Sequence, residues 1–326
     1  MKKYTHAWIA FKAIERLEKG KVADTDRKYA DSLIKWFKGR KDGVMHGAWY
    51  PDEVIKDMAT SHVLKFTPSQ QGAGTFRTLP GSSLIYTEGK KSVLYNKAYV
   101  VDPEDNLPER CEALTHSVID NLRVQAIEPK GSPIAPVDNH IALILFMLSH
   151  YVADAHVPFH CDSRRFSSGV NLHGQLEEVW EKEVERYFDI DEANERFFYN
   201  REGYPLPKTS PDYSGSFLKR VEDELVKRKF LVDWGTGNGN VREYMTALCQ
   251  YSYLLSYIFI PQKYNETNVS LDNWQKLPDQ GISLEYLSFV VLSDSIDSIA
   301  RIWLRLWRRY VQWKEGRDEP PGDLGG

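Results

Sequence analysis

The chain has little cysteine, no excess of positive charge and no long apolar run, and each shortage argues against a class of protein. Its 326 residues include only three cysteines, far apart and without a C-x-x-C pair, which argues against a disulfide framework and a thiolate zinc site. With 42 Lys and Arg against 46 Asp and Glu, the net charge is -4. The chain therefore lacks the basic surface typical of proteins that grip a nucleic-acid backbone.

The apolar stretches are too short for a signal peptide or a membrane span. We therefore expect a cytoplasmic protein without stable membrane insertion, or a secreted one if the sequence is a trimmed mature form. Hydrophobic residues at 42% and charged residues at 27% are ordinary for a globular chain.

Apolar residues recur at helical spacing along most of the sequence. Helices are predicted at about 8–17, 29–37, 110–126, 141–155, 172–187, 217–230, 241–258 and 284–313. Another helix start is indicated at Pro51, where a proline precedes two acids, and a loop is expected at 39–47. Without βαβ alternation or a clear linker, the pattern predicts an all-α fold. We expect a single compact multi-helix domain over 1–316 and a flexible tail at 317–326.

The stretch 67–107 differs from the rest of the chain, because glycine and proline punctuate short apolar runs. We expect an irregular insertion there, with room for a hairpin.

Two pairs of candidate metal ligands stand out. His150 and Asp154 lie four apart in the most apolar predicted helix, and His173 and Glu177 repeat this spacing, with His160 between the pairs. Side chains four apart share one helix face, so each pair can converge on one ion. The alternatives are a hydrogen-bonded pair inside the core for the first and a solvated helix face for the second. The repetition favours metal binding, and ligands without thiolates favour zinc, with manganese or iron as alternatives.

The spacing H-x3-D-x5-H, followed by H-x3-E, resembles that of the zinc-dependent phospholipases C and the related single-strand-specific zinc nucleases. His150, Asp154, His160, His173 and Glu177 match the pattern. The resemblance implies a compact helical protein with three zinc ions in one cleft. The family also has a histidine in its first helix, an aspartate and a histidine before the central helix, and a ligating chain terminus.

These further positions fall on His6, Asp52, His62 and the Met1 amine and carbonyl. Asp57 is a rival to Asp52, because the interval from Asp52 to His62 is shorter than the family's. Methionine replaces the usual terminal tryptophan, although the ligating atoms there belong to the backbone. The implied zinc sets are Asp52, His62, His150 and Asp154; Met1 and His6 with Asp154 bridging; and His160, His173 and Glu177.

By resemblance, the chain is a trinuclear-zinc phosphodiester hydrolase in which a zinc-bound hydroxide attacks phosphorus in line, with Asp52 orienting the water or accepting its proton. Glu177 as the last ligand is similar to the phospholipases, whereas Asn171 and Leu172 before His173 resemble the nucleases. We favour a phospholipase C-like enzyme. The alternatives are a single-strand nuclease or nucleotidase and, from another class, a non-catalytic metal-stabilised binding protein.

The expected partners are a small phosphodiester, a phospholipid headgroup or a single-stranded nucleic acid. Four aromatic residues near the ligands could stack on bases, contact headgroups or simply pack in the core. They are Trp49, Tyr50, Phe159 and Phe166. A di-iron helical protein is a weaker reading, since such sites favour Glu-x-x-His and carboxylate-rich ligand sets.

Overall fold

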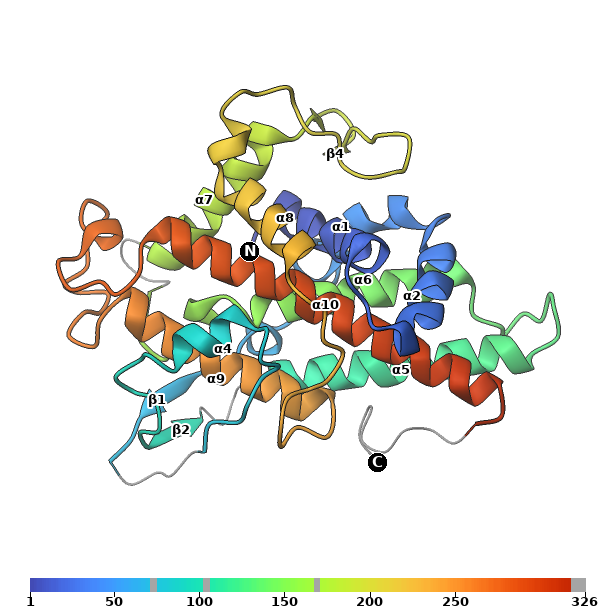
Figure 1. Cartoon of the computed structure of the whole chain (residues 1–326), viewed down its shortest axis with the longest axis horizontal. Coiled ribbons are helices and arrows are strands. Elements are labelled where there is room, and N and C mark those ends of the chain that lie inside the picture. The colour runs from blue at the N-terminus through green and yellow to red at the C-terminus, as the bar shows by residue number, and fades with distance from the viewer. Residues whose placement is uncertain (71–74, 102–105, 167–170, 318–326) are drawn as a thin grey trace.

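The computed structural model describes residues 1–70, 75–101, 106–166 and 171–317, and within these ranges the chain is helical (Figure 1). The all-α prediction is confirmed, and the long helices lie where the apolar periodicity indicated. The helices are α1 (Lys3–Lys19), α2 (Asp24–Phe37), α3 (Val44–Gly47), α4 (Leu84–Gly89), α5 (Leu107–Ile127), α6 (Asp138–Asp154), α7 (Leu172–Tyr187), α8 (Phe217–Lys227), α9 (Val241–Phe259) and α10 (Leu284–Lys314). The predicted tail lies outside the described residues beyond position 317.

Strands are few and short in the described ranges. β1 (Phe66–Pro68) pairs antiparallel with β2 (Tyr99–Val101), and β3 (Ile190–Asp191) pairs antiparallel with β4 (Arg196–Phe197). The first pair joins the start of the stretch 67–107 to a segment near its end, within the expectation of an irregular insertion with room for paired strands. The stretch also contains α4, which the sequence did not predict. Ser83 caps α4 by accepting a hydrogen bond from the Tyr86 amide. The glycines around this helix obscured its start in the sequence.

Two short elements also differ from the prediction. The expected loop 39–47 ends in α3, and the helix expected at Pro51 is a single π-helical turn over Pro51–Ile55. The turn ends because Lys56 adopts the left-handed conformation at φ 51°. A non-glycine residue in this region terminates a right-handed helix.

Two helices build the centre of the molecule. α10 crosses it and packs against α1, α2, α6 and α8 (Figure 1). α6 is buried without a break from Ile144 to Asp154, as expected of a helix that is apolar on nearly every face. The C-terminal end of α6 therefore carries His150 and Asp154 into the core. Among the described residues, no helix combines the length and apolarity required to cross a bilayer.

Candidate metal centre

The C-terminal end of α6 carries the first pair of candidate ligands. His150 and Asp154 are buried, and His150 Nε2 lies 3.3 Å from Asp154 Oδ2. His150 Nδ1 donates a hydrogen bond to the Ala48 carbonyl at 2.9 Å, so the proton of the neutral ring is on Nδ1. This bond orients the ring and leaves Nε2 available to a metal, as second hydrogen bonds of metal-binding histidines usually do.

The chain from Pro51 to His62 brings the next candidates to the same place. His62 Nδ1 lies 3.0 Å from Asp154 Oδ2, and Asp52 Oδ1 lies 3.5 Å from His150 Nε2. Asp57 lies elsewhere, because its Oδ2 accepts a 2.6 Å hydrogen bond from the Tyr151 hydroxyl and pairs with Arg110. Of the two aspartates that the sequence left open, Asp52 is the one beside the histidines.

The first turn of α1 supplies His6 from the opposite side. The His6 ring stacks on the His150 ring with 4.0 Å between centroids, and its Nε2 lies 3.5 Å from Asp154 Oδ1. Both ring nitrogens of His6 are buried without a hydrogen-bond partner. Burying unsatisfied polar atoms is costly, so a cation held by these nitrogens would remove a penalty that the protein alone leaves standing.

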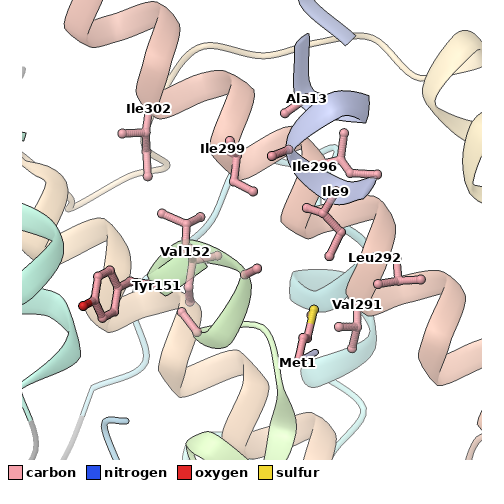
Figure 2. Close-up of a cluster of buried hydrophobic side chains, with 14 of the residues drawn as sticks. Met1, Ile9, Ala13, Tyr151, Val152, Val291, Leu292, Ile296, Ile299 and Ile302 are labelled. Atoms are coloured by element: carbon pink, nitrogen blue, oxygen red, sulfur yellow. The ribbon is translucent and has the colours of Figure 1, made fainter. Parts of the chain in front are cut away.

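The amine of Met1 lies between two carboxylates. It is 2.7 Å from Glu177 Oε1 and 3.3 Å from Asp154 Oδ1. The Met1 side chain lies in the same buried cluster as Ile9 and Val291 (Figure 2). Apolar packing therefore holds the amine inside the cluster of candidate ligands.

A third group lies where α7 meets the segment after α6. His173 and Glu177 are one turn apart on α7, with His173 Nε2 2.8 Å from Glu177 Oε1. His160 Nε2 lies 3.3 Å from the same oxygen, and His160 Nδ1 donates to the His62 carbonyl at 2.8 Å. This bond again fixes the tautomer with Nε2 towards the centre. Asn171 begins α7 and accepts a hydrogen bond from the Gly174 amide, which sets the direction of the helix.

The candidate ligand atoms form three groups, each with its atoms within 4.8 Å of one another. The groups are His6, His150 and Asp154; Asp52, His62 and His150; and His160, His173 and Glu177. His150 thus belongs to two groups, whereas the sequence assigned it to one. The Met1 amine joins the first group to the third. All nine predicted positions lie together, and their role as metal ligands stays a prediction.

The charges in this cluster are strongly coupled. Burial opposes the charge of the Met1 amine, but Glu177 and Asp154 outweigh it and raise the amine pKa to about 10. Burial also opposes the charge of His150, yet Asp154 and Asp52 raise its pKa to about 9. In return, the amine and the histidines hold the carboxyl pKa of Asp154 and of Glu177 well below the usual range, despite burial.

His6 behaves in the opposite way. Burial, His150 and the Met1 amine lower its pKa well below 6.5, so its ring is neutral and able to bind a metal. The donor set of imidazoles, carboxylates and one amine suits zinc. These residues therefore fit the zinc centre that the resemblance implies.

The residues of the centre differ in their exposure to solvent. The Asp52 side chain is 35% exposed and His173 is partly exposed, whereas His150 is fully buried. Trp49 and Tyr50 are half-buried, and the Trp49 ring lies 5.9 Å from the His6 ring. Phe159 and Phe166 are buried in the core and unavailable for stacking on bases, so the packing interpretation holds for these two.

An open groove of about 860 Å³ lies beside the centre, lined by Trp49, Lys2 and residues of α7, and none of the nine candidate ligands lines it. Its acidic lining residues are Glu53, Glu181, Glu185, Asp189, Glu192 and Glu195, against the bases Lys2, Lys3 and Lys208. The surface beside the centre is therefore acidic in this groove.

Sequence reasoning missed the residues that hold the ligands in place. Glu181 accepts hydrogen bonds from the backbone amides of Tyr4 and Thr5 and from the Thr5 hydroxyl, which fixes the first turn of α1 beside α7. The Ala48 and His62 carbonyls, which orient His150 and His160, are backbone atoms. A pattern of side chains in the sequence therefore cannot predict these two contacts.

No protein-family model matches this sequence, and no curated protein matches it. Among solved structures, the chain is similar to the alpha-toxin of Clostridium perfringens from avian strain SWCP, with a TM-score of 0.49 and 14% identity over 96% of this chain and 65% of the toxin chain. It is also similar to the alpha toxin of Clostridium absonum, with a TM-score of 0.42 and 16% identity over 94% of this chain and 64% of the toxin chain. The chain thus spans just under two thirds of the length of either toxin, and neither likeness is close enough to assign a family.

Proposed function

We propose that the protein is a trinuclear-zinc phosphodiester hydrolase of the phospholipase C-like kind. The observation that carries the proposal is the convergence of nine ligand positions from four parts of the chain on one partly open centre. The two unsatisfied nitrogens of buried His6 support it. If the cluster were only a hydrogen-bond network, these nitrogens would have hydrogen-bond partners, as buried polar atoms usually do.

Each group of residues has a separate part to play. The histidines and Asp154 would hold the ions in the core, while Glu177 and the Met1 amine would connect the third set to the second. Bound zinc ions would supply Lewis acidity towards a phosphoryl oxygen and would lower the pKa of a coordinated water.

Asp52 has the position of a proton acceptor. Its carboxylate lies at the exposed edge, 3.7 Å from His62 Nε2 and 3.5 Å from His150 Nε2. A carboxylate at this edge can orient an attacking water and take its proton while remaining open to solvent, which would carry the proton away.

The acidic groove favours a small headgroup over a nucleic-acid strand. A single strand needs a positively charged track along its backbone. The groove presents six acids and three bases, and its field would repel a polyanion. A single phosphodiester would be attracted only at the centre itself, where the positive charge of bound zinc ions would exceed the negative charge of the carboxylates.

The test is hydrolysis by protein whose zinc content has been measured. The substrates are bis-p-nitrophenyl phosphate, phosphatidylcholine and single-stranded DNA. We expect the wild type to cleave the first two. His150→Ala should lower the rate at least about a hundredfold, because two of the three groups of candidate ligands lose the histidine that they share.

His140→Ala is the matched control, since His140 is exposed near the start of the same helix and should leave the rate unchanged. Cleavage of DNA alone would shift the assignment to a nuclease. Failure of zinc-loaded wild type on all three substrates would instead favour a non-catalytic metal-stabilised protein.

A further inference from the structure

The buried histidine just after α6 is hydrogen-bonded away from the candidate ligands. His156 lies two residues beyond Asp154, and its ring is fully buried. Its Nδ1 donates a hydrogen bond to the Val152 carbonyl at 2.8 Å, and its Nε2 accepts one from the Ser298 hydroxyl of α10 at 3.1 Å. Both ring nitrogens therefore have partners within the protein, so His156 is not placed to bind a metal.

The hydrogen bonds behind His156 run in one direction. The Arg301 guanidinium can only donate, and it donates to the Tyr244 hydroxyl, which lies 2.9 Å from Ser298 Oγ. The Tyr244 proton is then directed to Ser298, and the Ser298 hydroxyl donates to His156 Nε2. This chain keeps the proton of the neutral ring on Nδ1, where it meets the Val152 carbonyl.

The Val152 carbonyl is one of the last acceptors of α6. Carbonyls in the last turn of a helix lack an amide partner further along the helix, so other donors satisfy them. His156 supplies two donors, since its ring bonds Val152 and its backbone amide bonds the Ala153 carbonyl at 3.0 Å. The Val152 side chain packs in the same buried cluster as Ile299 of α10 (Figure 2). His156 thus closes the turn that carries Asp154.

The direction of the Asp154 side chain decides whether it can serve two groups of ligands at once. Its Oδ1 faces the first turn of α1, 3.5 Å from His6 Nε2, whereas its Oδ2 lies 3.0 Å from His62 Nδ1. A carboxylate shared in this way has little freedom, because a rotation towards one group moves it away from the other. The backbone that carries it must therefore be held in place, and the His156 ring bonds that backbone.

We propose that His156 is a positioning residue of the metal centre, which aims the Asp154 carboxylate by fixing the last turn of α6 through the Val152 carbonyl. This inference rests on the proposed function and deepens it, because it adds to the same centre a residue outside the set of ligands. Groups that support metal ligands from behind typically change metal affinity by about ten- to a hundredfold.

The test uses Co²⁺ in place of zinc, because the visible absorption of bound Co²⁺ reports the arrangement of its ligands without any turnover. His156→Leu keeps much of the bulk of the side chain and removes both ring nitrogens. We expect it to weaken Co²⁺ binding by at least about tenfold and to shift the absorption bands. His156→Asn places an amide nitrogen close to where Nδ1 stands. It retains a donor for the Val152 carbonyl and should restore the spectrum and most of the affinity.

Trp303→Phe is the matched control. Trp303 Nε1 on α10 donates to the Leu145 carbonyl of α6 at 3.0 Å, so this change also removes a buried hydrogen bond between the two helices. The bond lies away from the last turn of α6. Trp303→Phe should lower the melting temperature and leave the Co²⁺ spectrum and affinity unchanged.

Ser298→Ala is a milder change that keeps the histidine, and it decides the test if His156→Leu does not fold. It should shift the Co²⁺ spectrum in the same direction but by less, because the ring loses the donor that fixes its tautomer. Ser295→Ala is its control, since Ser295 Oγ donates to the Val291 carbonyl at 2.8 Å and this bond stays within α10. The control should give the wild-type spectrum.

A wild-type spectrum and affinity for His156→Leu would overturn the proposal, as would an equal change in Trp303→Phe or no recovery in His156→Asn. For the milder pair, equal spectra of Ser298→Ala and Ser295→Ala would overturn it. Hydrolysis of bis-p-nitrophenyl phosphate by the zinc-loaded wild type tests the proposed function separately. Failure of the wild type to bind Co²⁺ at all would remove both.

Discussion

Two aspartates five residues apart have different surroundings, from which we expect different roles. Asp52 faces His62 and His150, whereas Asp57 is engaged by Tyr151 and Arg110. Both are aspartates in the short segment before His62, so the sequence does not distinguish them. Only the fold places Asp52 beside the histidines and Asp57 against Tyr151 and Arg110.

We therefore expect Asp52→Asn to affect catalysis and Asp57→Asn to affect stability. The first should keep most of the zinc, because His62 and His150 of its group remain. It should lower kcat on bis-p-nitrophenyl phosphate by about a hundredfold or more through loss of the proton acceptor. The second should lower the free energy of unfolding by about 1–3 kcal/mol, because it weakens bonds to a partly buried carboxylate. Steady-state kinetics, zinc analysis and urea unfolding together check the pair. If Asp57→Asn were the one that lost catalysis with stability intact, the assignment would be reversed.

The pKa values of the Met1 amine and His150 predict proton release when zinc binds. The raised values of about 10 and about 9 mean that both groups carry a proton near neutral pH in the metal-free protein. Both must lose it to donate to a metal, so zinc binding at pH 7.5 should release about two protons. The number of protons released should fall, and the affinity for zinc should rise, as the pH approaches these pKa values.

Calorimetric zinc titrations in buffers of different ionisation enthalpy measure this release. An observed enthalpy independent of the buffer would show that no proton leaves. The amine would then have no part in binding the metal.

At the scale of elements, the sequence predicted the long helices and missed the short ones. α6, α9 and α10 are long and strongly periodic, so their existence followed from their own residues. α4 has six residues, and β1 and β2 have three each, which is too few for a periodic signal. The two strands are also far apart in sequence, so their pairing depends on the rest of the fold.

The junction of α1 and α7 gives a prediction about an element start. Glu181 satisfies the first amides of α1, and the same turn sets the position of the Met1 amine. Glu181→Ala should lower the free energy of unfolding of chelator-treated protein by about 1–3 kcal/mol and weaken zinc binding, because buried donors would lose their acceptor. Glu181→Gln retains an acceptor oxygen and should recover most of both.

Urea unfolding and zinc titration measure these two effects. Lys182→Ala, at the neighbouring and 69% exposed position, is the control and should change neither. Equal behaviour of the alanine and glutamine variants would mean that the hydrogen bonds to α1 contribute nothing measurable.

At the scale of the molecule, a buried ion network joins distant helices. Arg228 Nη1, just after α8, lies 2.6 Å from Asp294 Oδ1 on α10, and Asp294 Oδ2 accepts from Ser83 Oγ at the start of α4. Arg16 on α1 pairs at 2.6 Å with Asp297 on α10. Four helices are thereby tied together by charges that have little access to water.

Asp294 makes stability depend on pH. Burial opposes its charge, but Arg228 and Ser83 outweigh burial and lower its pKa below the usual 3.8. The unfolded chain therefore takes up this proton at a higher pH than the folded one. The contribution is complete above about pH 4 and is lost as the pH falls through the folded pKa.

Asp294→Asn should thus lower the free energy of unfolding by about 3 kcal/mol near pH 7, and by less as the pH falls below about 4. The measurement is urea unfolding of chelator-treated protein over this pH range. Asp120→Asn, at an exposed position of α5, is the control and should follow wild type throughout. A deficit for Asp294→Asn that stays constant down to about pH 3 would contradict the assigned pKa shift.

The sequence alone determined the helical class, the types of ligand available and the sharing of one face by each His–acid pair, because these depend on residues within one or two turns of each other. The tertiary structure decided which segments meet. It places Asp52, and not Asp57, beside the histidines, and it brings the Met1 amine next to Glu177. It also gives two groups a common member in His150, and it directs two backbone carbonyls towards the ring nitrogens of His150 and His160. These outcomes depend on contacts between residues 88 to 176 positions apart, which local periodicity does not encode.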